Sequence, residues 1–252
     1  MILYGISRIG QETRQLFCTQ KIRGLNPLSG NFLQLIKIYR IVHSMCRTYI
    51  LCPNIYKRIN RLLELTDCKS AVVENYPYPV CISTNFEVCH GNILNKNLLC
   101  GDVVNIDVCL IYNSDVIDGC RSYTMKNRLL IPNNSYIKYN HELYKAAKDN
   151  WGSIINNIKH KHCKQYYYAH GLNGYIHTKP FISAHCKSKK IPLNTPLAFE
   201  IMYTKSRSYK KKDEYVIEGD KNVFHIEDTI IFSQDFILIP TYDITYHECV
   251  LN

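Results

Sequence analysis

The spacing of apolar residues predicts two helices near the start of the chain. Between positions 35 and 49 apolar residues recur at steps of three and four, namely Leu35, Ile38, Val42, Met45 and Tyr49. This is the spacing of one helix face, so a helix is expected to end at about Tyr49. A second apolar series follows Pro53 and consists of Ile55, Ile59, Leu62, Leu63 and Leu65. Asn54 is the expected N-cap of this second helix.

Strand patterns dominate most of the remaining chain. Short apolar runs predict strands at residues 71–73, 80–83 and 103–112, and strand patterns return after Gln165. In residues 223–232 alternate positions divide between two faces, and one face carries Val223, His225, Glu227, Thr229 and Ile231. A third helix is expected from Ser135, and a shorter one through residues 154–158. The pattern predicts an α+β fold of two strand-rich halves, each with helices on one side.

Length and local composition predict one domain with a basic arm. A chain of 252 residues is near the upper limit of a single hydrophobic core. Residues 1–30 show no clean period and carry four basic residues against Glu12. We therefore expect an N-terminal arm of unknown role at residues 1–30 and one catalytic domain at residues 31–252. An organellar targeting peptide or a docking extension would both fit the arm.

Charge and cysteine content restrict the partners and the compartment. The chain has 31 basic and 21 acidic residues, a net charge of +10, which would attract polyanions such as ribosomal RNA. The basic residues gather at 187–190 and 207–212, where the simpler interpretation is solvated loops. No apolar run approaches the roughly 18 residues of a membrane span. Twelve cysteines without a C-x-x-C pair or a recognisable signal peptide favour a reducing compartment, the cytoplasm, and we expect a monomer.

Several acids interrupt apolar runs, where a carboxylate is costly unless a cation compensates it. Asp107 lies in the strand-like residues 101–108, and Asp118 follows eleven positions later, across the turn-like residues 113–115. A hairpin could bring both carboxylates to one site, although Asp118-Gly119 alone would be interpreted as a turn. Glu200 and Glu227 lie in two further apolar strands, and His170 follows a run of tyrosines.

Four carboxylates and one imidazole have the chemistry of a metal centre. Their charge matches that of two divalent cations, and these donors suit Mn, Fe(II), Co or Zn. Two such ions roughly 3.5 to 4 Å apart can activate a water and polarise a carbonyl group, which is hydrolase chemistry.

These residues also lie in motifs of a known family. The motifs are residues 76–83, 87–91 and 101–108, His170-Gly171-Leu172 with His177 downstream, Phe199-Glu200, and residues 226–229. In this order the chain resembles the type I methionine aminopeptidases over about residues 33–241. The resemblance implies a pita-bread fold, in which two pseudo-symmetric halves of antiparallel sheet are covered by helices on one side. It also implies removal of the N-terminal methionine from nascent polypeptides by a hydroxide that bridges two divalent metal ions.

The resemblance assigns an expected role to each motif residue. The metal ligands would be Asp107, Asp118, His170, Glu200 and Glu227. Glu200 would also relay a proton, His177 would hydrogen-bond the scissile carbonyl oxygen, and His90 would lie near the scissile nitrogen. The methionine side chain would contact Tyr76, Cys81 and Ile176. The chain departs from the family pattern in residues behind the ligands, among them Gly119, Ile201 and Asp228.

Other interpretations stay open at this stage. A peptidase that cleaves before proline uses the same metals, and a non-catalytic relative could bind RNA or the ribosome through its basic loops. Cys81 or Cys89 beside His90 could act as a nucleophile, but this leaves the buried acids unexplained. His160, His162 and Cys163 could form a separate metal site, although a solvated basic helix end is the more ordinary interpretation.

Overall fold

The structure is a computed structural model that describes residues 30–133, 169–182, 192–232 and 237–241. The chain divides into the units Met1–Gly30 and Asn31–Asn252, and the description below concerns the second. The expected helices from Ser135 onwards, the cluster of His160, His162 and Cys163, and the basic residues 187–190 lie outside the described residues. Residues 1–29 also lie outside the described residues, so the N-terminal arm stays a prediction.

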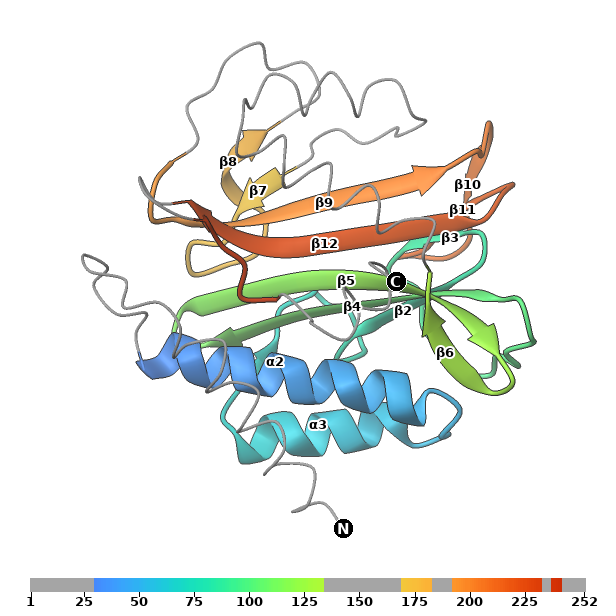
Figure 1. Cartoon of the computed structure of the whole chain (residues 1–252), viewed down its shortest axis with the longest axis horizontal. Coiled ribbons are helices and arrows are strands. Elements are labelled where there is room, and N and C mark those ends of the chain that lie inside the picture. The colour runs from blue at the N-terminus through green and yellow to red at the C-terminus, as the bar shows by residue number, and fades with distance from the viewer. Residues whose placement is uncertain (1–29, 134–168, 183–191, 233–236, 242–252) are drawn as a thin grey trace. The chain divides into compact units, whose positions relative to one another are not determined.

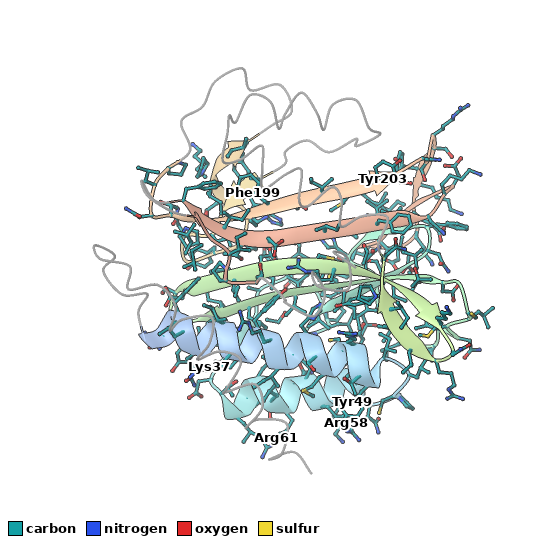
Figure 2. The ribbon with its side chains drawn as sticks, viewed as in Figure 1. Lys37, Tyr49, Arg58, Arg61, Phe199 and Tyr203 are labelled. Carbon is teal, nitrogen blue, oxygen red and sulfur yellow. The ribbon has the colours of Figure 1, made fainter. Side chains whose placement is uncertain are left out.

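Both helices predicted at the start of the chain are present. Helix α2 spans Gly30–Tyr49 and helix α3 spans Ile55–Leu65. Their apolar faces are buried, whereas Lys37, Arg58 and Arg61 project from the exposed faces (Figure 2). Asn54 is the N-cap residue as predicted, although its side chain makes no cap hydrogen bond. Two residues that the pattern placed on the apolar faces, Tyr49 and Leu65, are instead 42% and 67% exposed, because each lies at the end of its helix.

The main structure is a ten-stranded, largely antiparallel sheet. Its central path runs β1-β4-β5-β12-β9-β7-β8, while β2 pairs with β4, β6 with β5 and β13 with β12. The strands are β1 (Lys69–Ser70), β2 (Cys81–Thr84), β4 (Val103–Tyr112), β5 (Asp115–Lys126), β6 (Leu129–Pro132), β7 (Ala169–Gly171), β8 (Thr178–Ile182), β9 (Pro196–Thr204), β12 (Val223–Phe232) and β13 (Ile237–Leu238). The expected strand at residues 71–73 is wrong. Residues 71–73 are an irregular segment, and the apolar side chain of Val72 packs from it into a core cluster.

Helices α2 and α3 lie beside the β4 and β5 half of this sheet (Figure 1). The ring centroids of His43 in α2 and Tyr123 in β5 are 5.9 Å apart. A separate small sheet, in the order β10-β11-β3, joins β10 (Tyr209–Lys211) and β11 (Ile217–Gly219) to β3 (Glu87–Cys89). The architecture confirms the predicted α+β class, with helices on one side of the first half.

The predicted hairpin is confirmed. Strands β4 and β5 pair antiparallel along their whole length, from Val103 opposite Thr124 to Tyr112 opposite Asp115. The turn between them consists of Asn113 and Ser114, both with positive φ, which is typical of a tight two-residue hairpin turn. Gly119 lies inside β5, so the interpretation of Asp118-Gly119 as a turn is wrong.

Two further sequence expectations concern membranes and cysteines. None of the helices in the described part of the chain combines the length and the apolar character needed to cross a membrane. All eight cysteines that the described residues include are free.

Candidate functional site

The register of the sheet brings the five predicted ligand residues to one face. Cys109 pairs with Asp118 and Asp107 with Cys120, so the two aspartates are diagonal neighbours across β4 and β5. Glu227 in β12 pairs with Cys120 on one side and with Glu200 in β9 on the other. His170 in β7 pairs with Ala198, two residues before Glu200. Because side chains alternate between faces along each strand, all five ligand residues project from the same side of the sheet.

These side chains line a single pocket. The pocket wall consists of Val72, Cys89, His90, Asp107, Cys109, Asp118, His170, Ile176, His177, Glu200, Met202, His225 and Glu227. Of the residues predicted to act on substrate, His90, His177 and Ile176 lie in this wall. Cys81 is fully buried in the adjacent core cluster, against which Tyr76 and Ile176 pack. The roles that the resemblance assigns to these residues remain predictions.

Distances between the donor atoms are those of a metal centre. Nε2 of His170 lies 3.8 Å from an oxygen of Glu200 and 3.8 Å from an oxygen of Glu227. Asp118, His170 and Glu227 each offer a ligand atom within 4.8 Å of the other two. Nitrogen and carboxylate donors bind transition metals at about 2.0–2.2 Å, so the donors of His170, Glu200 and Glu227 are close enough to share an ion.

Burial perturbs the acids of the pocket in a way that a cation would relieve. Desolvation, reinforced by the charge of Asp118, raises the pKa of Asp107 to about 8. Desolvation, reinforced by Glu200, raises the pKa of Asp118 to about 7. The pKa of Glu227 is also well above its usual value, from burial and then Asp118. One oxygen of Asp107 is buried and has no hydrogen-bond partner among the described residues. This donor set fits divalent cations.

Glu200 behaves differently from the other acids. Burial opposes its ionisation, but the imidazoles of His225, His170 and His177 outweigh this effect and lower the pKa of Glu200. Desolvation in turn lowers the pKa of His170 and of His90, and lowers that of His177 to about 4. These three imidazoles are therefore neutral near pH 7, the form in which a histidine binds a metal or donates one N–H hydrogen bond.

The backbone at the two predicted substrate histidines is unusual. His90 has φ +54° and His177 has φ +56°, in the left-handed region that few residues other than glycine adopt. Such conformations cluster at functional sites, where the surrounding structure enforces them. The residue after His90 is Gly91, where a Cβ atom would lie 2.6 Å from Oε2 of Glu87. This close approach explains the glycine of the 87–91 motif.

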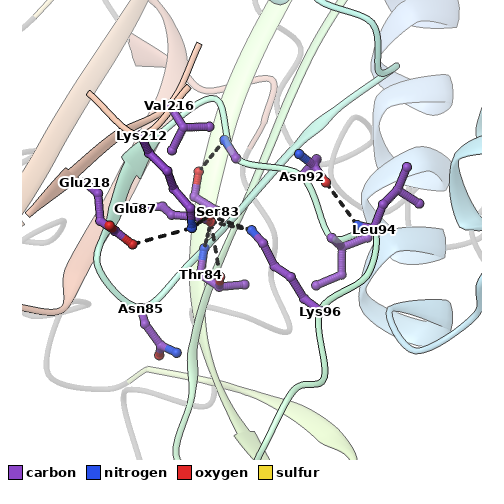
Figure 3. Close-up of polar contacts among 12 residues, drawn as sticks. Ser83, Thr84, Asn85, Glu87, Asn92, Leu94, Lys96, Lys212, Val216 and Glu218 are labelled. Carbon is purple, nitrogen blue, oxygen red and sulfur yellow. Dashed lines mark hydrogen bonds and ion pairs between the residues drawn. The ribbon is translucent and has the colours of Figure 1, made fainter. Parts of the chain in front are cut away.

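Glu87 anchors the segment that carries His90. The backbone N–H of Thr84 donates to Oε2 of Glu87 at 2.7 Å, and Lys96 donates to the same oxygen at 2.6 Å. Lys212 donates to Oε1 at 3.0 Å. These contacts tie the loop after β3 to the turn that follows β10 (Figure 3). They also show that Lys212, from the basic residues 207–212, is ion-paired even though its side chain is exposed.

A buried ion pair between Arg121 and Asp228 lies next to Glu227 and contacts its backbone. Arg121 donates from NH1 to the backbone carbonyl of Glu227 at 2.6 Å and forms an ion pair with Asp228. NH2 of Arg121 also donates to the carbonyl of Thr241 at 3.0 Å. At Gly119 a Cβ atom would lie 2.5 Å from the hydroxyl of Tyr39. Two departures from the family pattern are thus accounted for by contacts: the Tyr39 hydroxyl occupies the space beside Gly119, and Asp228 pairs with Arg121.

The site includes one residue that the sequence analysis did not select. His225 lies in the pocket wall, and its Nε2 atom is 3.6 Å from Oε2 of Glu200. The alternation of residues 223–232 did place His225 on the same face as Glu227. That signal could have identified it, but a single histidine on a half-apolar strand face is more often structural.

The alternative of a cysteine nucleophile is contradicted by the environment of the thiols. Burial, followed by the charges of Glu200 and Asp107, raises the pKa of Cys89 to about 12. Burial and the charge of Asp107 raise the pKa of Cys81 well above its usual value. Reactive cysteines need the opposite, an environment that favours the thiolate.

Comparisons with known proteins agree with the motifs. The sequence is 28% identical over 147 residues to the human mitochondrial methionine aminopeptidase 1D, a match that covers 50% of this chain and 41% of that protein. It is 27% identical over 185 residues to the methionine aminopeptidase of Buchnera aphidicola, covering 66% of this chain and 70% of that one. No protein-family model matches the sequence. These relatives confirm the resemblance to methionine aminopeptidases.

Solved structures show the same fold. The structure of a methionine aminopeptidase from Thermotoga maritima matches with a TM-score of 0.67 and 19% identity, over 86% of this chain and 98% of that one. A prolidase from Pyrococcus furiosus matches with a TM-score of 0.57 and 16% identity, over 82% of this chain and 64% of that one. The predicted pita-bread fold is therefore confirmed.

Proposed function

We propose that this chain is a metal-dependent aminopeptidase that removes the N-terminal methionine from nascent polypeptides. The observation that carries the proposal is the convergence of Asp107, Asp118, His170, Glu200 and Glu227 in one pocket that also contains His90 and His177. The relatives whose sequences match are named methionine aminopeptidases. Divalent ions held by the five ligands would polarise the scissile carbonyl group and lower the pKa of a water molecule.

The protein groups around the ions have complementary tasks. Burial opposes the ionisation of Glu200, but the adjacent His225 side chain outweighs burial and lowers the pKa of Glu200, so this carboxylate can accept a proton from the attacking water and deliver it to the departing amine. His177 is neutral and can donate its N–H to the carbonyl oxygen as negative charge develops there. His90, also neutral, would contact the substrate near the scissile nitrogen.

The pocket wall supports the choice of methionine. Val72, Ile176 and Met202 supply apolar surface beside the acids. Tyr76 lies beside this wall, with its ring 6.3 Å from that of His90, and its hydroxyl donates to the carbonyl of Gly91 at 2.7 Å. A flexible thioether packs well against apolar and aromatic surfaces of this kind. Tyr76, Cys81 and Ile176 are the residues that we propose to contact the methionine side chain.

The decisive experiment is methionine release from a Met-Ala-Ser peptide by the full chain loaded with Mn²⁺ or Co²⁺. We expect the Glu200→Gln variant to lose at least about a hundredfold in kcat, because proton transfer by a positioned group contributes about 10²–10⁴. The matched control is Glu64→Gln, which replaces an exposed acid of α3. Equal rates for wild type and Glu200→Gln would exclude this mechanism, and cleavage of Xaa-Pro peptides alone would exclude methionine removal.

We also propose that the protein acts in the cytoplasm and meets nascent chains near the ribosome. The net charge of +10 supports this proposal. The basic residues 207–212 support it less than their number indicates, because Lys210 and Lys212 both pair with Glu218. Co-sedimentation with ribosomes at low salt, lost at high salt, is the expected result. Absence of the protein from the low-salt pellet would remove this part of the proposal.

A further inference from the structure

His225 is the one imidazole of the pocket to which neither the motifs nor the proposed mechanism gives a task. It lies in β12 opposite Met202 and two residues before Glu227. The residue is only 3% exposed. Its Nε2 atom is buried and has no hydrogen-bond partner within the described parts of the chain. A buried ring nitrogen without a partner is costly, so the position calls for a ligand.

Hydrogen bonds to neighbouring strands fix the backbone of His225. The backbone N–H of His225 donates to Oγ of Ser122 at 2.9 Å, and this hydroxyl lies 3.0 Å from the carbonyl oxygen of His225. Ser122 in turn donates to Oδ1 of Asn105 at 2.6 Å. Because β4, β5 and β12 all contribute to this polar cluster, His225 starts from a fixed point on the sheet.

His225 and His170 lie near different oxygens of the same two carboxylates. His170 Nε2 lies 3.8 Å from Oε1 of Glu200 and 3.8 Å from Oε1 of Glu227. His225 Nε2 lies 3.6 Å from Oε2 of Glu200 and 3.9 Å from Oε2 of Glu227. Two donors that share an ion at about 2.1 Å each cannot be more than about 4.2 Å apart. The spacing around His225 meets this limit as well as the spacing around His170 does.

We propose that Nε2 of His225 is a sixth protein ligand of the metal centre and binds an ion together with Glu200 and Glu227. The inference rests on the proposed metal-dependent function and extends its ligand set to four carboxylates and two imidazoles. A second nitrogen donor shifts the preference of a site from Mn²⁺, which favours oxygen ligands, towards Zn²⁺ or Co²⁺. The chain is therefore expected to select zinc or cobalt over manganese.

The test compares metal affinities of the full chain and two histidine variants by isothermal titration calorimetry. His225→Gln keeps a polar side chain of similar reach, and His90→Gln is the matched control, because it removes an imidazole of the same pocket that we do not assign to the metal. We expect His225→Gln to weaken Zn²⁺ binding at least about tenfold and Mn²⁺ binding clearly less, while His90→Gln changes neither. Equal losses for both ions, or no loss, would overturn the assignment.

A measurement on the unaltered protein covers the case in which a variant folds poorly. X-ray absorption of the wild type with zinc bound should show scattering from two imidazoles per chain at saturation, and a single imidazole would overturn the proposal. The two levels of inference fail differently. Zinc binding that is insensitive to His225 removes only the sixth ligand, whereas metal-loaded protein that releases no methionine removes only the proposed activity.

Discussion

Glu87 and three acids of the metal pocket, Asp107, Asp118 and Glu227, are all carboxylates that lose most of their contact with water, yet their pKa values shift in opposite directions. Glu87 accepts from Lys96, Lys212 and the amide of Thr84. Burial opposes its ionisation, but these partners outweigh burial and lower its pKa. Asp107 has no described hydrogen-bond partner at one oxygen, and burial with the neighbouring Asp118 raises its pKa to about 8.

The difference separates a carboxylate that stabilises the fold from carboxylates that await a ligand. A charge that serves packing is neutralised by residues of the chain itself. A charge that serves binding is left without such partners and weakens the protein until the ligand arrives. Burial alone therefore does not identify a functional acid, whereas a buried carboxylate that lacks a compensating partner, such as Asp107, is a candidate for one.

Metal removal should have the largest effect, because the acids of the pocket depend on a bound ion whereas Glu87 does not. Treatment with a strong chelator is expected to reduce methionine release from Met-Ala-Ser at least about a thousandfold, since both water activation and carbonyl polarisation are lost. Addition of Co²⁺ or Mn²⁺ should restore the rate. Full activity in the chelated protein would show that the acids of the pocket need no metal ion for catalysis.

Arg121→Met tests the ion pair behind the pocket. The change leaves Asp228 as an uncompensated buried carboxylate, and we expect the free energy of unfolding to fall by about 3–5 kcal/mol in urea titrations. A second change, Asp228→Asn, should recover part of this loss because it removes the stranded charge. Arg61→Met, at an exposed pair with Glu64, should cost less than about 1 kcal/mol. Equal costs at the two arginines would contradict the structural role of Arg121.

Glu87→Gln should lower the free energy of unfolding by about 2 kcal/mol, because charge-assisted hydrogen bonds to two lysines are lost. The pH dependence has a definite sign. The folded pKa of Glu87 lies below its unfolded value of about 4.3, so its contribution is present above that pH and is lost as pH falls through the folded pKa. Denaturant titrations from pH 7 to pH 3 should show the difference between wild type and variant shrinking. A constant difference would refute the assigned ion pairs.

Asp107→Asn should have the opposite sign and a smaller size. The folded pKa of Asp107 is about 8, above the unfolded value of about 3.9, so in metal-free protein this group removes stability as pH rises between the two. The variant should raise the free energy of unfolding of chelated protein by roughly 1 kcal/mol at pH 8. The same variant should lose the stabilisation that added metal gives the wild type. Destabilisation of the chelated protein would show that Asp107 resembles Glu87 after all.

Local sequence was a good guide to some elements and a poor one to others. The hairpin of β4 and β5 follows from the apolar run of residues 103–112 and from the turn-like residues 113–115. Gly119 taken alone would be interpreted as a turn residue, because nothing nearby in the sequence indicates that the Tyr39 hydroxyl occupies the space of its missing side chain. The pairing of Arg121 with Asp228 joins residues 107 positions apart. No local pattern can report such a contact.

The sequence by itself determined which acids are out of place, because the cost of a carboxylate within an apolar run is a local property of Asp107, Glu200 and Glu227. The order of these residues was enough to identify the family resemblance. Only the tertiary structure decided that they share one pocket with His225, because distances across a sheet depend on strand register, and register is set by the packing of whole strands. A one-residue shift of β12 would have turned both Glu227 and His225 to the opposite face.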